Sequence, residues 1–383
     1  MKIGISTSVV ARGQTGISRY VCSLAKALLE HTQPHEFTLF VLEEDAPLFA
    51  FAEHRMEIVK VPERFRPPAR DIFWHQVGLP VLARAYHLDV VHVPSYRRMI
   101  WGSPCAMVAT IHDLAPFHVA GKYDWKRMLY GRYAARVLAR RQDQIIAVSQ
   151  NTAQDVRKFF KVPPGRLNVI YNGLDHAQFC PGPAEAARAM VEEKYGVRGP
   201  FFLYVARLEH PGKNHINLIG AFEEFKSETQ SPWQLALAGK DWTGAQVIHG
   251  AIRTSPFSKD IHCLGFVPDE DLPKLYQAAE ALVSPSLFEG FGLPLVEAMA
   301  CGCPVLCSNG GSTAEIVHGT ALTADAHEVS VWTRQLTRLA TDAKLRLQLR
   351  EAGLLRAEQF DWKKAAAATL EVYRRAAKWK NLG

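Results

Sequence analysis

Short apolar runs alternate with helix-like periodicity along almost the whole chain, and this alternation restricts the fold more than any other feature. A helical face begins at Ile17 directly after the first run. Runs of this length that alternate with helices predict βαβ units with parallel strands. The runs of the first half are KIGIST, FTLFVLE, LDVVHV, MVATIHD, QIIAVS and LNVIYN, and the helical face comprises Tyr20, Val21, Leu24, Ala25 and Leu28.

The alternation is interrupted once and then restarts. The segment from Cys180 to Pro200 is bounded by proline and glycine and is interpreted as a linker that carries a short helix. After it come FFLYVAR, WQLALAG, IHCLGFV, ALVSPS and PVLCS. A chain of 383 residues also exceeds the size of one hydrophobic core.

We therefore predict an α/β protein with two tandem Rossmann-like domains, each a doubly wound parallel sheet. The first would comprise residues 1–180 and the second residues 181–360. Open sheets of this kind bind ligands at the carboxyl ends of their strands, so the two domains are expected to face a shared cleft. Residues 361–383 read as an amphipathic helix that we expect to pack back toward the N-terminal domain.

The net charge of +7 lies in the first half of the chain. Residues 1–180 contain 23 lysines and arginines against 15 aspartates and glutamates, and the remaining residues contain 22 against 23. Two interpretations stay open, a solvated basic face or contact with an anionic membrane or lipid diphosphate. Nucleic acid is not expected as a partner, because no recognition motif accompanies the charge. The arginines considered for membrane contact are Arg64, Arg66, Arg70, Arg97 and Arg98.

Composition also bears on location and metal binding. The start of the chain lacks a signal-like apolar segment, and no apolar run reaches the roughly 18 residues of a membrane span. An odd count of seven cysteines fits a reducing compartment, so we expect a cytoplasmic protein, with peripheral contact at the inner face of the membrane as an extension. Cys301, Cys303 and Cys307 have no second group at zinc spacing and are interpreted as buried thiols.

The stretch LFEGFGLPLVEAMACGCPV places two carboxylates on either side of a strand-to-helix turn. Gly290 and Gly292 permit close approach of the backbone to a ligand, and Pro294 suits the first helical position. The helix start would offer N–H groups to an anion. Glu289 in the loop and Glu297 in the predicted first turn can accept hydrogen bonds from a polyhydroxyl ligand. The structural alternative is that Glu297 only complements the helix dipole and that Glu289 is a solvated loop residue.

This stretch resembles the E-x7-E signature of the retaining nucleotide-sugar glycosyltransferases of family 4, which have the GT-B fold. The resemblance covers almost the whole chain and is strongest from Ala206 to Val317. It implies transfer of a hexosyl unit from a nucleoside-diphosphate sugar to a hydroxyl acceptor. The other matching segments are VARLEHPGKNH, CLGFVPDEDLPKLYQAAEALVSPS, GGSTAEIV, YNGLD and FDWKKAAAATLEVYRRA.

The resemblance also implies roles in the second domain. Arg207 at a strand end and Lys213 at the start of the next helix would hold the donor diphosphate. Two fixed cations can replace a metal at the leaving group, so neither a metal nor another cofactor is expected. Glu297 would accept from the ribose hydroxyls, and Glu289 would lie beside the donor sugar. The further donor-binding positions are Gly265, Val267, Gly290, Phe291 and Gly292.

In the first domain the resemblance points to two positions. Gly16 matches a glycine-rich turn facing the donor phosphates, although Thr15 stands where a second glycine is common. His112 follows a strand and matches a histidine that hydrogen-bonds the transferred sugar; a purely structural histidine is the alternative. Ser149 is predicted to cap a helix, and Asn172 with Gly173 is predicted to shape a turn at the cleft.

The pattern, including IHDLAPF, is similar to that of bacterial mannosyltransferases of surface-polysaccharide assembly. This favours GDP-mannose as donor, with a UDP-hexose as the alternative, and a saccharide or polyprenyl-diphosphate-linked saccharide as acceptor. A nucleotide-sugar epimerase and a non-catalytic nucleotide-sugar sensor are the other classes considered. The acidic run at residues 269–271 mimics a metal-binding motif but precedes a helix, which favours helix capping.

Overall fold

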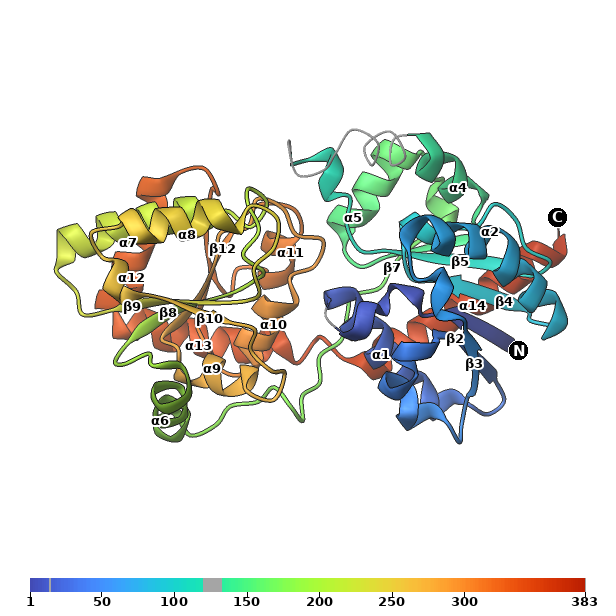
Figure 1. Ribbon diagram of the computed structural model, residues 1–383, viewed down its shortest axis with the longest axis horizontal. Helices are drawn as coiled ribbons and strands as arrows, with labels where there is room; N and C mark the ends of the chain where they lie inside the picture. The colour runs from blue at the N-terminus through green and yellow to red at the C-terminus, as the bar shows by residue number, and fades with distance from the viewer. Residues whose placement is uncertain (14, 120–132, 383) are drawn as a thin grey trace. The chain divides into compact units, whose positions relative to one another are not determined.

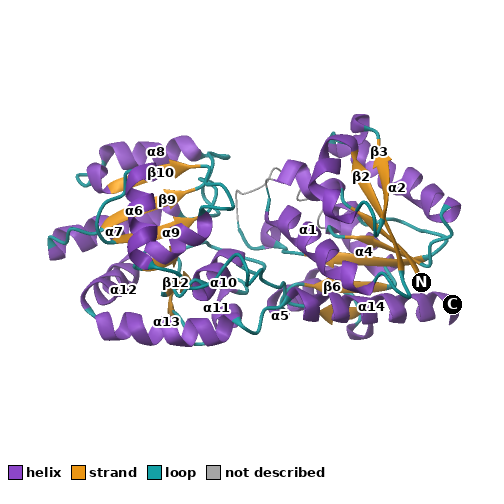
Figure 2. Cartoon of the chain, turned by 90° about the horizontal axis from the view of Figure 1, so that it is seen from below, coloured by secondary structure: helices purple, strands orange, loops and turns teal. Residues whose placement is uncertain are grey.

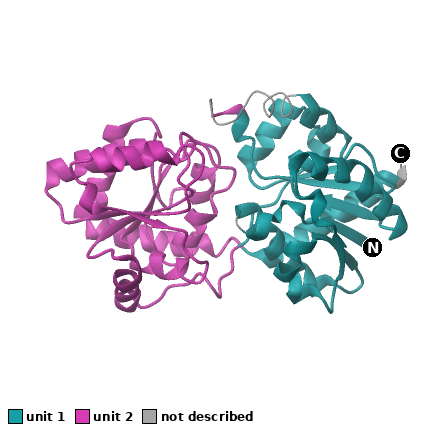
Figure 3. Cartoon of the chain, in the orientation of Figure 1, with its two compact units in different colours: residues 1–116, 123–173, 361–383 teal, residues 117–122, 174–360 magenta. Residues whose placement is uncertain are grey.

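The structure is a computed structural model that describes residues 1–13, 15–119 and 133–382 (Figure 1). It divides into two compact units (Figure 3). The first unit comprises residues 1–116, 123–173 and 361–383, and the second comprises residues 117–122 and 174–360. The chain therefore passes from the first unit to the second after Gly173, whereas the boundary predicted from the sequence lies after residue 180.

The first unit is built on a seven-stranded sheet in the order β3-β2-β1-β4-β5-β6-β7. All of its strands are parallel, and Ile3 of β1 pairs with Phe37 on one side and Val90 on the other. The strand order reverses between β1 and β4, as in a doubly wound sheet. The strands are β1 (Lys2–Ser6), β2 (Glu36–Leu42), β3 (Glu57–Val61), β4 (Val90–Val93), β5 (Ala106–Ile111), β6 (Gln144–Ala147) and β7 (Leu167–Val169).

Helices cover both faces of this sheet (Figure 2). The α1 face predicted from the sequence is buried at all five of its positions, and Ser149 caps α5 by accepting the Thr152 N–H at 3.0 Å, as predicted. The α-helices are α1 (Gly16–Leu28), α2 (Pro68–Ala85), α4 (Ala135–Arg141), α5 (Gln150–Asp155) and α14 (Trp362–Leu382). The other helical segments are η1 (Ser8–Gly13), η2 (Leu29–His31), η3 (Glu43–Ala52), η4 (Glu63–Phe65), η5 (Tyr96–Arg98), η6 (Ala115–Phe117), η8 (Val156–Phe160) and η9 (Pro164–Arg166).

The second unit repeats this plan with six parallel strands in the order β10-β9-β8-β11-β12-β13. Here the order reverses between β8 and β11. Its core includes Phe202, Phe222, Phe225, Trp233 and Trp332. The strands are β8 (Phe201–Val205), β9 (Gln234–Ala238), β10 (Ile261–Gly265), β11 (Ala281–Ser284), β12 (Val305–Ser308) and β13 (Leu322–Ala324). The helices are α6 (Ala184–Tyr195), α7 (His215–Thr229), α8 (Ala245–Thr254), η10 (Ser258–Asp260), α9 (Leu272–Ala278), α10 (Leu293–Ala300), α11 (Thr313–Val317), α12 (Val329–Thr341) and α13 (Ala343–Ala357).

Two strands, β3 and β13, are absent from the sequence-based prediction. Both lie at sheet edges. An edge strand is half-exposed and need not be a continuous apolar run, and β3 accordingly reads EIVKV with a charge at two of its five positions. The predicted strands of the sheet interiors are all present.

The short helix predicted as part of a linker is α6, and it belongs to the second unit. It packs against α9, and its Lys194 Nζ lies 2.5 Å from an Asp271 carboxylate oxygen. The Tyr195 hydroxyl donates to the same carboxylate at 2.6 Å. Asp271 precedes α9 but makes no side-chain cap there, so the predicted capping by the acidic run is wrong for this residue. Its carboxylate anchors α6 instead.

The C-terminal helix α14 belongs to the first unit, where it packs against α1 and β5. At its start, a Cβ on Gly173 would lie 2.2 Å from the Trp362 backbone nitrogen, so a side chain cannot be accommodated at residue 173. In the described part of the chain, no helix has the length and apolar character needed to cross a bilayer.

Candidate functional site

The strand-order reversal of the second sheet gathers most of the predicted donor-site residues. The loop after β8 carries Arg207 and Lys213, and the loop after β11 carries Glu289. These two strands are neighbours in the sheet, and both loops leave from its carboxyl edge. Ligands of doubly wound sheets bind at this position because the adjacent loops diverge there.

A close ion pair joins the two loops. The Lys213 Nζ lies 2.5 Å from Glu289 Oε1, and both side chains are largely buried. The Tyr204 hydroxyl donates to the Lys213 carbonyl at 2.8 Å and lies 2.9 Å from the Ser286 Oγ. Burial, reinforced by the Glu289 charge, raises the pKa of Tyr204 well above its usual value, so the hydroxyl stays protonated. Tyr204 thus holds both loops to the end of the sheet.

The sequence suggested that Lys213 opens the next helix, but in the structure it precedes that helix. Helix α7 begins at His215, and Asn214 precedes it in a left-handed conformation with φ 57°. The Asn214 amide donates to the carbonyls of Pro285 at 3.1 Å and Ala326 at 2.7 Å. The residue that follows Lys213 is therefore anchored to the loop after β11, which fixes the base of the lysine.

Arg207 lies beyond the last residue of β8 and is held from two sides. Its Nη2 is 2.9 Å from Glu209 Oε2, and its guanidinium lies 4.7 Å from the centre of the Trp242 ring. The arginine side chain is 41% exposed, whereas that of Glu209 is 6% exposed. The charge is thus oriented by a buried carboxylate and an aromatic face while remaining accessible to an anion. Neither Glu209 nor Trp242 is predicted from the sequence as a site residue.

The Glu289 loop is shaped by the GGST segment after β12, which the sequence analysis used only as a matching segment. The Glu289 carbonyl accepts from the Ser312 N–H at 2.9 Å and from its Oγ at 3.1 Å. A Cβ on Gly310 would lie 2.2 Å from the Leu287 carbonyl oxygen, and one on Gly311 would lie 2.3 Å from that of Glu289. The two glycines are therefore required by this close backbone contact.

Helix α10 starts at Leu293 rather than at Pro294. Gly292 occupies the cap position with φ 90°, a conformation that favours glycine. Phe291 is buried, and its ring meets that of Phe360 edge to face at 5.6 Å. The loop 290–292 is therefore a rigid support for the helix start, with its aromatic side chain turned into the protein.

Glu297 differs from the sequence-based expectation. No acidic residue lies in the first turn of α10, because the helix begins one residue earlier than Pro294. Glu297 is buried, and its Oε2 accepts from the Tyr276 hydroxyl at 2.8 Å. Simple complementation of the helix dipole does not account for a buried, hydrogen-bonded carboxylate. The role toward a ribose stays a prediction.

The end of β10 carries the remaining predicted positions of this unit. Gly265 has φ 66° and its carbonyl accepts from Gly239 N–H at 2.8 Å, while Val267 is buried. Between them Phe266 exposes its ring, and the Lys240 ammonium lies 4.3 Å from the ring centre. Gly265 and Val267 can therefore offer only backbone groups to a ligand, and Phe266 is the accessible side chain.

In the first unit, Gly16 is the first residue of α1. Thr15 caps this helix, and its Oγ1 accepts the Ser18 N–H at 3.1 Å. Thr15 therefore has a structural role as the cap of α1. A Cβ on Gly16 would meet no atom within 4 Å, so the fold itself leaves open space there. The role of Gly16 toward donor phosphates stays a prediction.

His112 directly follows β5, as predicted. Its Nε2 lies 3.2 Å from the Pro94 carbonyl oxygen and must donate to it, which leaves Nδ1 as the acceptor. The Tyr20 ring packs edge to face against the imidazole at 4.7 Å. Desolvation lowers the pKa of His112 to about 4, against the opposing effects of the Asp113 charge and the Pro94 carbonyl. The imidazole is therefore neutral near pH 7.

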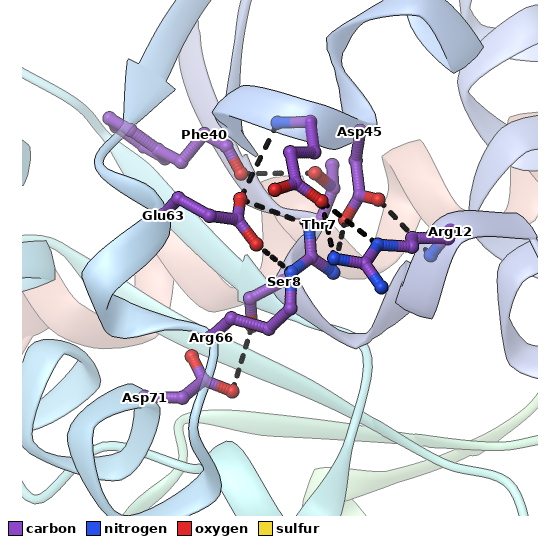
Figure 4. Close-up of polar contacts among 9 residues, drawn as sticks. Thr7, Ser8, Arg12, Phe40, Asp45, Glu63, Arg66 and Asp71 are labelled. Atoms are coloured by element: carbon purple, nitrogen blue, oxygen red, sulfur yellow. Dashed lines mark hydrogen bonds and ion pairs between the residues drawn. The ribbon is translucent and has the colours of Figure 1, made fainter.

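A charged network holds the loop between β1 and α1 (Figure 4). Asp45 is fully buried and accepts from the Arg12 backbone N–H at 3.1 Å and from Arg66 at 3.2 Å. Ser8 donates to Asp71 at 3.3 Å. Arg12 itself has φ 56°, so the carboxylate of Asp45 stabilises an uncommon backbone conformation. The network is structural support for the loop.

The same contacts correct one expectation about the basic clusters. Arg66 is paired with Asp45 and with Glu63, and Arg98 is paired with the buried Asp71. Two of the five arginines considered for membrane contact are therefore neutralised inside the unit. Their charge is satisfied by protein carboxylates rather than by solvent or lipid.

The cysteine cluster is buried, as predicted. Burial raises the pKa of Cys301 and of Cys307 to about 12, and it raises the pKa of Cys303 as well. The three thiols therefore stay protonated. Among residues 1–13, 15–119 and 133–382, no group of three or more His, Cys, Asp or Glu side chains is placed to hold a metal ion.

Comparison with protein families matches both halves of the chain. The family described as Glycosyltransferase Family 4 matches residues 14–178, and the family described as Glycosyl transferases group 1 matches residues 190–356. The first match takes in every strand of the first sheet except β1, the second takes in all strands of the second sheet, and together they cover most of the chain.

Relatives of known activity agree with these two family matches. The O-antigen chain mannosyltransferase B of Escherichia coli is 28% identical over 390 residues, which span 98% of this chain and 100% of that protein. The serotype-specific mannosyltransferase WbdA of Escherichia coli is 29% identical over 71% of this chain and 34% of its own length.

Two solved structures share the fold over nearly the full length. Sucrose-phosphate synthase from Thermosynechococcus elongatus has a TM-score of 0.78 at 21% identity, covering 98% of each chain. Anabaena HepE, in complex with UDP and glucose, has a TM-score of 0.75 at 20% identity, covering 97% of this chain and 98% of that chain. The protein belongs to the family 4 glycosyltransferases and has their two Rossmann-like domains of the GT-B fold.

Proposed function

We propose that the chain is a retaining mannosyltransferase that transfers mannose from GDP-mannose to a saccharide acceptor in surface-polysaccharide assembly. The observation that carries this proposal is the end-to-end similarity to the O-antigen chain mannosyltransferase B, at 28% identity over 98% of this chain and 100% of that protein. The similarity to WbdA, also a mannosyltransferase, points to the same donor sugar.

The pair of cations at the second sheet supports transfer from a nucleoside diphosphate. As the sugar leaves, negative charge develops on the diphosphate. Arg207 is accessible and oriented, and Lys213 is fixed through its neighbour Asn214, so both can stabilise this charge without rearrangement of the backbone. The N–H groups at the start of α10 would add to the stabilisation.

The ion pair between Lys213 and Glu289 suggests how a donor would be received. In the structure each charge neutralises the other across 2.5 Å. With a donor bound, the ammonium would contact phosphate oxygens and the carboxylate would accept from hydroxyl groups of the sugar. The pair would thus keep two partly buried charges satisfied both before and after donor binding.

Retention and independence of a metal complete the proposal. Glu289 is paired with Lys213, and Glu297 is hydrogen-bonded to Tyr276, so neither carboxylate is set as the nucleophile of a glycosidase-like double displacement. The departing phosphate oxygen would instead assist deprotonation of the acceptor hydroxyl on the same face of the sugar. The two protein cations would take the place of a metal ion at the diphosphate.

For the acceptor we propose a growing saccharide, either free or linked to polyprenyl diphosphate. An acceptor linked through a diphosphate would suit the excess of basic residues in the first half of the chain. The same excess leads us to propose peripheral contact with an anionic membrane at its cytoplasmic face.

A thermal-shift panel with GDP, UDP and ADP and with their sugars tests the donor. Binding to the native state raises the melting temperature by mass action, so GDP and GDP-mannose should give the largest increases. A larger increase with UDP and a UDP-hexose would replace the mannose donor. Product analysis separates the remaining classes: release of nucleoside diphosphate without sugar transfer indicates an epimerase, and binding without turnover indicates a sensor.

A further inference from the structure

Tyr20 of α1 is a buried tyrosine whose ring contacts two other aromatic rings of the first unit. One edge-to-face contact joins it to the His112 imidazole, with 4.7 Å between the ring centres, and a second joins it to the Trp362 indole at 5.7 Å. The Tyr20 hydroxyl is also held, because it lies 3.1 Å from Thr110 Oγ1. The side chain is therefore fixed both at its ring and at its polar end.

The hydrogen bonds of Tyr20 continue through the interior of the sheet to the last helix. Thr110 Oγ1 also lies 2.8 Å from His92 Nε2, and the other ring nitrogen of His92 lies 2.8 Å from the Tyr373 hydroxyl. All four side chains are buried. A buried polar group that loses its partner is costly, so the complete set of bonds favours a single arrangement of these side chains.

These side chains gather on the face of the first sheet that also carries the strand-end histidine. Thr110 and His112 are two residues apart, so their side chains point to the same side of the extended chain. Tyr20 accordingly contacts both of them. His92 reaches Thr110 from the neighbouring strand β4, and helix α14 packs against α1, β4 and β5. The last helix of the chain therefore covers the residues that surround Tyr20.

Helix α14 holds Tyr20 by two separate contacts. Trp362, the first residue of the helix, packs directly on the Tyr20 ring. Tyr373 acts on the Tyr20 hydroxyl through the buried hydrogen bonds. About three turns of helix separate the two residues, so both lie on one face of α14. The position of Tyr20 thus depends on the packing of the last helix.

We infer that Tyr20 is a positioning residue for His112 and that helix α14 holds it in place. The inference rests on the proposed function, together with the predicted hydrogen bond from His112 to the transferred sugar. The Pro94 carbonyl fixes the tautomer of the imidazole and leaves Nδ1 as the acceptor. Tyr20 restricts the remaining freedom, which is rotation of the imidazole ring, because an edge-to-face contact favours one orientation of the two rings.

A double-mutant cycle tests whether Tyr20 acts through His112. In steady-state transfer assays, Tyr20→Leu and His112→Ala should each lower kcat by about tenfold or more, because a misplaced or missing contact to the sugar raises the barrier. The double variant should be no slower than His112→Ala alone, because Tyr20 then has no imidazole to position. Tyr20→Phe keeps the ring and should retain most of the wild-type rate.

Tyr86→Leu is the control for Tyr20→Leu. Tyr86 lies in the same unit and packs edge to face on Phe40 with 6.2 Å between the ring centres. Its replacement therefore removes a comparable ring contact outside the predicted site and should leave kcat unchanged. The melting temperature of every variant separates a loss of rate from a loss of folded protein.

Variants of α14 test how the helix holds Tyr20. Trp362→Leu removes the direct ring contact, and Tyr373→Phe removes the hydroxyl at the far end of the buried hydrogen bonds. Both should lower kcat, and by less than Tyr20→Leu does, because each leaves the other contact in place. The matched control is Trp379→Leu, which removes an exposed aromatic residue of the same helix and should keep the wild-type rate.

A titration of the His112 imidazole by NMR tests the inference without turnover, with His112→Ala used to assign its signals. Burial lowers the pKa of His112 to about 4. The groups that face it are Asp113 of its own loop, whose charge opposes this shift, the neutral His92 of β4 and the Tyr20 ring. The smaller leucine of Tyr20→Leu should admit water and raise the pKa of His112 toward its ordinary value of 6.5, whereas Tyr20→Phe should titrate as the wild type does.

Three results would overturn the inference. One is a double variant in which the losses of Tyr20→Leu and His112→Ala multiply, which would show that the two residues act independently. Another is an unchanged titration of the imidazole in Tyr20→Leu. The third is a wild-type rate in both Trp362→Leu and Tyr373→Phe, which would remove the role of α14.

Failure of the proposed function would give a different pattern. The wild type would then transfer no mannose from GDP-mannose, or His112→Ala would keep the wild-type rate. The NMR titration would still decide whether Tyr20 positions the imidazole, because it requires neither donor nor acceptor.

Discussion

The two units share one sheet plan but equip its carboxyl edge in opposite ways. In each sheet the strand order reverses beside the first strand, between β1 and β4 in one and between β8 and β11 in the other. The second unit places ion pairs at that edge, with Arg207 and Lys213 each bound to a carboxylate. The first unit places a neutral histidine there, supported by buried hydroxyl groups.

In the first unit, a buried series of hydrogen-bonded side chains supports this histidine. The Tyr373 hydroxyl of α14 lies 2.8 Å from His92 Nδ1, and His92 Nε2 lies 2.8 Å from Thr110 Oγ1. Thr110 Oγ1 lies 3.1 Å from the Tyr20 hydroxyl, and Tyr20 packs on His112. Burial lowers the pKa of His92 to about 3, so this series of hydrogen-bonded side chains is uncharged near pH 7. It connects the last helix of the protein to the strand-end histidine.

The difference is what the proposed transfer reaction would require of the two units. Fixed charges are useful where charge develops, and a neutral, rigid hydrogen-bonding wall is useful where a sugar must be oriented. The same sheet geometry delivers both because function depends on loop residues rather than on the strands.

The largest effect should come from the cations of the second unit. Lys213→Ala or Arg207→Ala should lower kcat/KM for transfer by about 100-fold or more, the scale of removing one group that stabilises charge in the transition state. Steady-state kinetics with a soluble acceptor measures this effect. The matched controls are Lys259→Ala and Arg253→Ala, exposed cations of the same unit that should change little. Near-normal kcat/KM in both site variants would refute the diphosphate assignment.

The two glutamates of the second unit should separate by function. Glu297→Gln should weaken binding of the bare nucleoside diphosphate by roughly tenfold, the scale of a hydrogen bond to a charged group. Glu289→Gln should leave that affinity nearly unchanged and lower the rate of transfer. Calorimetric titration with the nucleotide, followed by transfer assays, distinguishes them.

Tyr276→Phe sharpens this test because it removes the hydroxyl that positions Glu297 and leaves the carboxylate in place. A nucleotide affinity lowered as in Glu297→Gln would indicate that orientation of the carboxylate matters. An equal loss of nucleotide affinity in Glu289→Gln and Glu297→Gln would contradict the division of roles.

The neutral histidines of the first unit predict a dependence of stability on pH. Their folded-state pKa values, about 3 for His92 and about 4 for His112, lie below the ordinary value of 6.5. The unfolded chain therefore binds more protons between these values. The stabilisation is complete above about pH 6.5 and is lost as the pH falls toward 4, by about 1.4 kcal/mol for each histidine and each pH unit.

Urea unfolding at pH 7.5, 5.5 and 4.5 measures this loss. His92→Asn removes one titrating group, so its free energy of unfolding should fall less steeply with decreasing pH than that of the wild type. His249→Asn is a control, because His249 lies outside this buried series of hydrogen bonds and pairs with Asp241. Equal slopes in the wild type and His92→Asn would show that the ring of His92 is not held neutral.

The smallest effect is expected from chelation. Transfer should persist in EDTA, because Arg207 and Lys213 supply the positive charge that a metal ion would otherwise bring to the diphosphate. Activity before and after EDTA treatment, with Mn²⁺ or Mg²⁺ added back, measures this. Loss of activity that either ion restores would reopen the acidic run at residues 269–271 as a metal site.

Local sequence is enough to specify the interior strands of both sheets and their order. Strands buried on both faces must be continuous apolar runs, and parallel strands must alternate with helices, so the interior strands of both sheets could be predicted. The positions that follow those strands, among them Arg207, His112 and Glu289, could be predicted for the same reason. The motif resemblance at loop residues such as Gly292 added the location of the turn that we propose binds the donor.

The partner that each of these residues meets follows only from the three-dimensional fold. Ion pairing and burial depend on segments far apart in the sequence, so nothing near Arg66 revealed Asp45, and nothing near Glu297 revealed Tyr276. The assignment of α14 to the first unit likewise rests on its contact with α1 and β5. Local periodicity specifies a helix and its apolar face, but the surface that covers that face is chosen by packing across the whole fold.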